Sequence, residues 1–81
     1  MNILASYRVA DFNALLERLK SWRNELSKKR NVPPYLILKN DTLEELAIVR
    51  PNTLTELENI IGMGDVKIAR YGNEILRIIN F

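Results

Sequence analysis

The sequence predicts an all-α fold, a compact bundle of four or five helices, and three observations lead to this prediction. Apolar residues recur at helical spacing through most of the 81-residue chain. Prolines, glycines and capping residues divide the chain into segments of the lengths that helices have in small domains. No segment alternates between apolar and polar residues for long enough to indicate a β-strand. We therefore expect one helical domain with a modest core, since a chain of this length buries only about 60% of its unfolded surface.

The first helix is expected to begin at Asp11, whose carboxylate can cap it, and to end near Asn31. Trp22 lies on the apolar stripe of this helix and is interpreted as a core residue. Residues 1–10 either brace the domain with their apolar side chains or form the end of a linker, and the sequence leaves both interpretations open. The helical domain itself is placed at residues 11–81. The apolar stripe consists of Phe12, Leu15, Leu16, Leu19, Trp22 and Leu26.

A proline-stiffened segment connects the first helix to the second. Pro33 and Pro34 have a fixed φ and no backbone N–H, and a residue that precedes a proline is disfavoured in helical geometry, so the first helix must end there. The four large apolar residues 35–38 follow in a segment too short for a helix, so at least some of them should enter the core. Asp41 is expected to cap the second helix, with Glu44 reaching back in a capping box.

Two further helix boundaries can be read from proline and capping residues. The second helix should be short, because Pro51 ends it at Arg50. Thr53 and Glu56 form another capping box, which starts a third helix that runs to about Ile61.

A glycine-rich turn separates the third helix from the fourth. Gly62 and Gly64 break the third helix, and a β-branched residue in place of Gly64 should damage folding if this glycine has a positive φ. Met63 is interpreted as a residue that closes the turn. Asp65 is expected to cap the fourth helix, which continues past Gly72. Whether Gly72 kinks this helix or lets a neighbouring element approach closely is left open by the sequence.

The composition excludes several kinds of chemistry. The chain has no cysteine for disulfides or thiolate chemistry, and no histidine, which is the commonest metal ligand and the usual proton shuttle near neutral pH. It has no Gly-x-x-x-x-Gly-Lys-Ser/Thr phosphate loop, so we expect no ATP hydrolysis and no cofactor. No apolar run approaches the roughly 20 residues that span a bilayer, and no signal-peptide pattern opens the chain. We therefore expect an intracellular protein without a membrane partner.

Positive and negative charges occupy different parts of the chain, although its net charge is only +2. From Arg8 to Lys39, eight basic residues stand against three acidic ones, which gives a net charge of +5. From Asn40 to Asp65, one basic residue stands against six acidic ones, which gives −5. The last sixteen residues carry +2. We expect one basic and one acidic surface, provided that these segments occupy different faces of the fold.

Several short motifs follow one another along the chain. They are Val32-Pro33-Pro34-Tyr35, the segment from Asp41 to Ala47, Pro51, Ile60-Ile61-Gly62-Met63-Gly64, Lys67 and Tyr71-Gly72. In this order they resemble the HRDC domain, the helicase-and-RNase-D C-terminal module, over roughly residues 15–79. The resemblance implies a helical fold and an accessory nucleic-acid-binding role in RecQ-type helicases, some UvrD/Rep-like helicases and RNase D. Members of this family differ in whether and what they bind.

Tyr35 is the strongest candidate for a contact with nucleic acid. An aromatic ring on a stiff loop suits a stacked base, and neighbouring cations suit its phosphates. Two plainer interpretations stay open: Tyr35 as a core residue, and cations that only complement the negative end of the first helix. The cations of this candidate site are Lys28, Lys29, Arg30 and Lys39.

The glycine-rich turn is the second candidate, since it looks like the hairpin of helix-hairpin-helix proteins. In such hairpins, glycines let backbone N–H groups at a helix start approach a phosphate, and a nearby lysine assists. Gly62 and Gly64 would form the turn, and Lys67 and Arg70 would be the cations. Because the carboxylate of Asp65 can satisfy the same donors, a purely structural turn stays open.

The acidic residues do not predict a metal site. Asp41 and Glu44 are already assigned to helix capping, and Glu45 brings no third converging ligand with it. A solvated helix face or a surface for protein docking is the expected role of this cluster.

These observations predict a non-catalytic accessory domain of a longer ATP-dependent DNA helicase, of the RecQ or UvrD/Rep type. It is expected to bind single-stranded or branched DNA weakly, as a monomer, in DNA repair or recombination, in the cytoplasm with the nucleoid or in the nucleus. The alternative is a protein-interaction or intramolecular docking module, whose acidic segment 41–65 contacts the motor domain of the parent helicase. A third interpretation, an RNase D-like setting, predicts RNA as the ligand.

Overall fold

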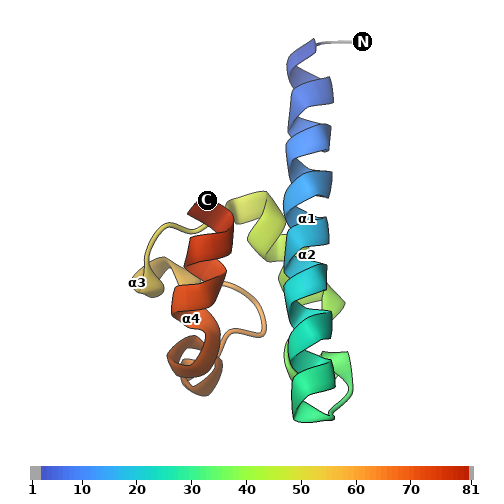
Figure 1. Cartoon of the computed structure of the whole chain (residues 1–81). Helices are drawn as coiled ribbons and strands as arrows, with labels where there is room; N and C mark the ends of the chain where they lie inside the picture. The colour runs from blue at the N-terminus through green and yellow to red at the C-terminus, as the bar shows by residue number, and fades with distance from the viewer. Residues whose placement is uncertain (1–2, 81) are drawn as a thin grey trace.

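A computed structural model describes residues 3–80 of the chain, with side chains described from Arg8 onward. Its elements follow in the order α1 (Ile3–Arg30), the 3-10 turn η1 (Pro34–Leu36), α2 (Asn40–Val49), α3 (Leu54–Leu57) and α4 (Asp65–Asn80). No strand occurs among residues 3–80, so the predicted all-α fold is confirmed. Figure 1 shows α1 along one side of the molecule, with the other helices beside the part nearer its C-terminus. The first turns of α1 stand clear of them.

Helix α1 begins well before the predicted start. It is continuous from Ile3, so Asp11 lies inside the helix and the prediction that Asp11 caps it is wrong. The physical reason is that no glycine or proline interrupts the residues before Asp11, and a started helix extends at little cost. Val9, one of the predicted bracing residues, is 59% exposed, whereas the side chains of Ile3, Leu4 and Tyr7 lie outside the described part. The placement of the domain boundary between residues 10 and 11 stays a prediction.

The end of α1 confirms the prediction that the helix stops near Asn31. Asn31 has a φ of 55°, in the left-handed region that asparagine tolerates better than most residues. Its N–H donates to the Lys28 carbonyl at 3.2 Å, and the Val32 N–H donates to the Ser27 carbonyl at 3.1 Å. This pair of bonds is a Schellman motif, which satisfies carbonyls at the helix end before Pro33 redirects the chain.

The core lies between the C-terminal part of α1 and the shorter elements. Ile37 and Leu38 are fully buried in it, which confirms that part of the apolar run 35–38 enters the core. Trp22 is only partly buried: its ring packs edge-on against Tyr71 with the ring centroids 5.7 Å apart. The prediction of Trp22 as a core residue is therefore confirmed only in part, because the side chain packs against the core but is not fully buried. The buried apolar residues are Leu15, Leu19, Ile37, Leu38, Leu43, Leu46, Ala47, Leu57, Ile60, Met63, Tyr71, Ile75 and Ile79.

Helix α2 begins without the predicted capping box. Lys39 is its N-cap residue, Leu43 N–H donates to the Lys39 carbonyl at 3.2 Å, and no side chain caps this end. Asp41 lies one residue inside the helix, so the prediction that it is the cap is wrong; there its charge still complements the helix dipole. The end is as predicted, because Arg50 closes α2 in the left-handed region, with a φ of 52°, directly before Pro51.

Helix α3 starts as predicted and ends early. Thr53 Oγ1 accepts a hydrogen bond from Glu56 N–H at 3.1 Å, and the Glu56 carboxylate accepts one from Asn52 N–H at 2.6 Å. The helix ends at Leu57 instead of about Ile61, and residues 58–60 continue it only as tight turns.

Helix α4 is a single uninterrupted helix, so Gly72 does not divide it. A Cβ at Gly72 would lie 2.8 Å from Leu54 Cδ2, closer than side-chain carbons approach. Of the two interpretations that the sequence left open, the close approach of a neighbouring element is correct.

Candidate nucleic-acid interface

Tyr35 is displayed on the surface by a segment that is itself firmly held. The side chains of Tyr35 and Leu36 are 60% and 56% exposed, while the next two residues, Ile37 and Leu38, are fully buried. Leu36 N–H donates to the Pro33 carbonyl at 3.1 Å, and Ile37 N–H donates to the Pro34 carbonyl at 3.0 Å. The interpretation of Tyr35 as a core residue is therefore wrong. The ring stands on a proline-stiffened turn whose far end is anchored in the core.

Arg23 provides a second anchor for this segment, which the sequence analysis missed. Its side chain is 8% exposed, and Nη1 donates to the Leu38 carbonyl at 3.0 Å and to Asn40 Oδ1 at 2.7 Å. Burial lowers the pKa of the Arg23 guanidinium from its ordinary value, because a charge is disfavoured away from water. The signal was its position, since Arg23 falls four residues after Leu19 on the apolar stripe.

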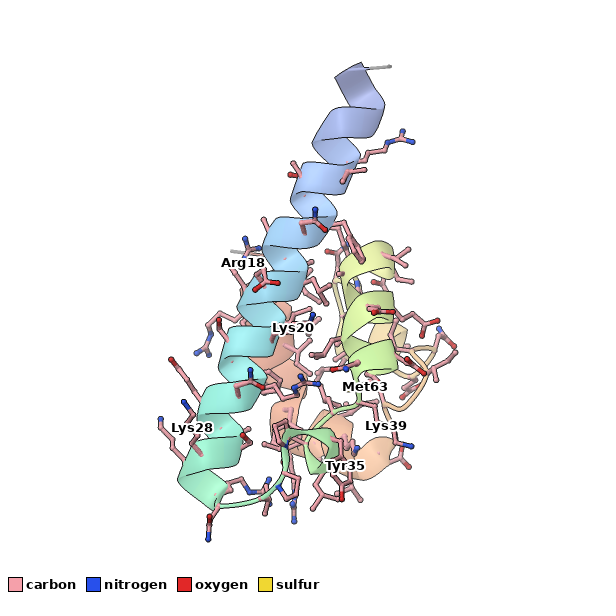
Figure 2. The ribbon with its side chains drawn as sticks, turned by 90° about the vertical axis from the view of Figure 1, so that its right-hand side faces the viewer. Arg18, Lys20, Lys28, Tyr35, Lys39 and Met63 are labelled. Atoms are coloured by element: carbon pink, nitrogen blue, oxygen red, sulfur yellow. The ribbon has the colours of Figure 1, made fainter. Side chains whose placement is uncertain are left out.

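The predicted cations do not all gather around Tyr35. Figure 2 shows Tyr35 and Lys39 on the same side of the molecule, while Lys28 lies on the outer side of α1, away from them. Lys39 is exposed at the start of α2, and Lys28 and Lys29 are exposed in the last turn of α1. Of the two predicted cations labelled in Figure 2, Lys39 is thus the one on the face that carries the ring.

Arg30 turns toward α4 and away from the predicted site. Its Nη1 donates to the Tyr71 hydroxyl, and its guanidinium carbon lies 6.0 Å from the centroid of the Tyr71 ring. Such a cation–π contact joins the end of α1 to α4. No local pattern in the sequence indicates this pair, because the two residues are 41 positions apart.

The glycine-rich turn is fixed by α2 through two hydrogen bonds. Thr42 Oγ1 donates to the Ile61 carbonyl at 2.8 Å, and Glu45 Oε2 accepts from Ile61 N–H at 2.5 Å. Gly62 has a φ of 85°, and a Cβ at this position would collide with Thr42 Oγ1. Gly64 has no positive φ, and a Cβ added to it would meet no atom within 4 Å, so the glycine that the turn requires is Gly62.

The remaining residues of the second candidate site lie at the start of α4. Lys67 is half-buried, Arg70 is exposed, and Asp65 is the exposed first residue of the helix. The prediction that Asp65 caps α4 is therefore wrong, because the carbonyl of Gly64, the residue before it, accepts the first bond of the helix from Ile68 N–H at 3.0 Å. Met63 lies on the buried side of the turn: it is only 5% exposed, and its N–H donates to the Ile60 carbonyl. Phosphate binding by Gly62, Gly64, Lys67 and Arg70 stays a prediction.

Comparison with known proteins identifies the family. The model of the HRDC domain matches residues 12–79. The chain belongs to the HRDC domain family. It is 34% identical over 65 residues to the ATP-dependent DNA helicase RecQ of Haemophilus influenzae, covering 80% of this chain and 10% of that protein. It is 37% identical over 65 residues to the helicase UvrD2 of Mycobacterium tuberculosis, covering 80% and 9%.

A solved structure agrees with this assignment. The HRDC domain matches D. radiodurans RecQ HRDC domain 3 with a TM-score of 0.78 and 41% sequence identity, over 88% of this chain and 90% of that one. The chain spans only about a tenth of the length of the curated relatives named above, so it is similar to one part of those helicases.

The acidic residues of this HRDC domain do not form a cluster with the geometry of a metal site. Asp41 and Glu44 are exposed on α2, and Glu45 is engaged by the backbone of Ile61. Within residues 3–80, no group of three or more histidine, cysteine, aspartate or glutamate side chains is placed to hold a metal ion. None of the described helices has the length and apolar character needed to cross a bilayer.

Proposed function

We propose that this HRDC domain is a non-catalytic accessory domain of an ATP-dependent DNA helicase and that it binds single-stranded or branched DNA weakly. The observation that carries the proposal is the exposure of Tyr35 on an anchored turn, with Lys39 on the same face. Its relatives support the setting, since several are named ATP-dependent DNA helicases.

An exposed ring on a rigid support has a physical advantage in binding. Stacking of a base on an aromatic side chain contributes about 1 to 3 kcal/mol and tolerates any sequence. A ring that is already held in place loses little conformational freedom when the base arrives. Ile37, Leu38 and Arg23 hold the backbone next to Tyr35, so the interaction energy is available for the ligand.

The cations set the strength and the salt dependence of the proposed binding. Lys39, which is exposed on the same side as Tyr35, would engage a phosphate beside a base stacked on the ring. The other predicted residues lie on neighbouring surfaces. They would contact the DNA strand only if the strand bends around the end of α1 or reaches the start of α4. These residues are Lys28, Lys29, Arg30, Gly62, Gly64, Lys67 and Arg70.

A fluorescence anisotropy titration tests this function. Fluorescein-labelled single-stranded and forked oligonucleotides are titrated with the domain at two salt concentrations. We expect weak saturable binding that becomes weaker as salt rises, because each phosphate contact releases counterions. The absence of binding at low salt, even near millimolar protein, would contradict the proposal.

A protein-docking function is the second candidate, and an apolar groove supports it. Ile48 and Val49 at the end of α2 are 70% and 55% exposed, next to acidic residues of the same helix. The groove between α1 and α2 is lined by Arg8, Val9, Asp11, Phe12, Ala47, Ile48 and Arg50. In this function the domain would rest against the motor domain of its parent helicase.

Chemical-shift mapping separates the two functions. Shifts confined to α2 and α3 when a helicase motor is added, with none near Tyr35 when DNA is added, would favour docking. Titration with RNA of the same sequence tests the RNase D-like alternative, because the same face would then prefer RNA. Roles in repair and recombination, a monomeric state and a location with the nucleoid or nucleus belong to this proposal.

A further inference from the structure

Helices α1 and α4 form a seam on a different side of the molecule from Tyr35. Figure 1 shows α4 and the segment that follows α1 on opposite sides of α1. Three contacts set an antiparallel register along the seam. Arg30 meets Tyr71, Trp22 donates through Nε1 to Glu74 Oε2 at 2.7 Å, and Arg18 donates through Nη2 to the Ile78 carbonyl at 3.4 Å. The seam therefore extends for roughly 18 Å along α1, since twelve residues separate Arg18 from Arg30.

A groove opens at the end of this seam, beside the last turn of α4. Its lining residues are Arg18, Trp22, Glu25, Arg77 and Ile78. Arg18 and Arg77 are exposed and come from two different helices, while the partly buried Trp22 and Ile78 supply an apolar surface between them. The groove thus combines two guanidinium groups with one indole.

The charge of the seam as a whole is positive. Its carboxylates are Glu25 and Glu74, and Glu74 accepts the hydrogen bond from the indole of Trp22. The cations outnumber them, since Lys29 lies seven residues after Trp22 on the same flank of α1 and the α4 cations repeat at three- and seven-residue spacing. These cations are Arg18, Lys29, Arg30, Lys67, Arg70 and Arg77.

We infer that this seam is a second nucleic-acid-binding surface, in which a single strand lays its phosphates against Arg18 and Arg77 and a base against Trp22. The combination selects the ligand class: a strand of nucleotides carries one negative charge and one flat apolar unit in each repeat. Arginine also suits this position, because its planar fork binds phosphate oxygens in pairs. The surface shares its ligand class with the proposed function, and the peripheral cations Lys29, Arg30, Lys67 and Arg70 belong to both proposals. Tyr35 and Lys39 are not part of the seam, and Arg18, Trp22 and Arg77 are not part of the proposed function.

Trp22 gives a direct readout of this surface, because it is the only tryptophan in the chain. Unlabelled dT12 is titrated into the domain while the intrinsic fluorescence is followed. We expect a saturable change in the wild type and the same change in Tyr35→Ala, whose other face is disabled. A constant Trp22 signal under conditions where labelled dT12 binds by anisotropy would overturn the inference and leave the proposed function untouched.

Paired variants test the two arginines. R18Q/R77Q should lower the affinity measured through Trp22 and make the slope of log K against log salt shallower by about 1.4, the loss of two single-strand phosphate contacts. R8Q/R50Q is the matched control, because it also neutralises two arginines that line one groove, on the α2 side of α1. An equal effect of the two double variants would mean that only net charge matters, and would contradict the inference.

A last arm distinguishes the class of partner. A polyglutamate peptide of matched charge is titrated in place of dT12. We expect a much smaller change in Trp22 fluorescence, since the peptide offers charge without a flat ring. An equal response to the peptide would assign the seam to an acidic protein partner and overturn its assignment to a nucleotide strand.

Discussion

The two halves of the apolar run at residues 35–38 differ in burial: the first two side chains are exposed and the last two are buried. Leu36 is 56% exposed, whereas Leu38, two residues later and chemically identical, is fully buried. Tyr35 is exposed like Leu36, and Ile37 is buried like Leu38. Hydrophobicity cannot explain this difference, because all four side chains would gain from burial. The 3-10 turn directs two of them outward, and the buried pair holds that turn on the core. The buried half, residues 37–38, stabilises the fold, and the exposed half, residues 35–36, is accessible to a ligand.

The matched leucines test this division most strongly. Leu38→Ala should lower the free energy of unfolding by about 2 to 5 kcal/mol, because it leaves a cavity in the core. Leu36→Ala should change it by no more than about 0.5 kcal/mol, as for other exposed sites. Urea denaturation followed by circular dichroism measures both. Similar losses for the two variants would show that the run is not divided between core and surface.

Arg23 tests the second anchor of the same segment. Arg23→Met keeps a long apolar side chain but removes the donors to the Leu38 carbonyl and to Asn40, so we expect a loss of about 1 to 3 kcal/mol. Burying a charge is itself costly, and removing that cost works in the opposite direction. A variant as stable as the wild type would contradict the assignment of Arg23 as a stabilising anchor of this segment.

A substitution of Tyr35 tests the function of the exposed half of the run, residues 35–36. Tyr35→Ala should weaken binding of single-stranded DNA at the Tyr35 face by about 1 to 3 kcal/mol, the contribution of one stacked base. The melting temperature should stay within a few degrees of the wild type, because the ring is largely in solvent. Anisotropy and thermal denaturation of the same preparation check both parts. A large fall in melting temperature would contradict the assignment of Tyr35 to the exposed half.

The lysines give the smallest expected effect. Lys39→Gln should make the slope of log K against log salt shallower by about 0.7, as for one single-strand phosphate contact. Lys28→Gln is the control of equal charge, and it should change the slope less because Lys28 lies on the outer side of α1. A larger change of slope for Lys28→Gln than for Lys39→Gln would contradict the proposal that the strand binds on the side of Tyr35 and Lys39.

Local rules predicted several boundaries of this fold from sequence alone. The end of α1 near Asn31, the end of α2 before Pro51 and the Thr53 cap each depend on residues adjacent in the chain. Three predicted caps failed, at Asp11, Asp41 and Asp65, because an aspartate also occurs inside a helix, on its exposed side or in its first turn, where its charge complements the helix dipole.

Long-range contacts decided what the sequence could not. The anchoring role of Arg23 was missed because the carbonyl and side-chain amide that receive its hydrogen bonds come from the segment after the prolines. Arg30 looked like a neighbour of Tyr35, and its actual partner is Tyr71 on α4. The turn requires a glycine at position 62 because Thr42, on helix α2, occupies the space that a Cβ would need. The directions of the Arg23 and Arg30 side chains, and the need for glycine at position 62, follow from packing between elements.

The central claim is that the Tyr35 ring receives a base, and its own proton resonances test this claim most directly. In a titration of the domain with single-stranded dT12, the ring protons of Tyr35 should move upfield and saturate, because a stacked base shields them. The methyl resonances of the buried Leu38 serve as the internal reference and should stay in place. Tyr35 ring protons that remain unmoved while DNA binding saturates would contradict the account.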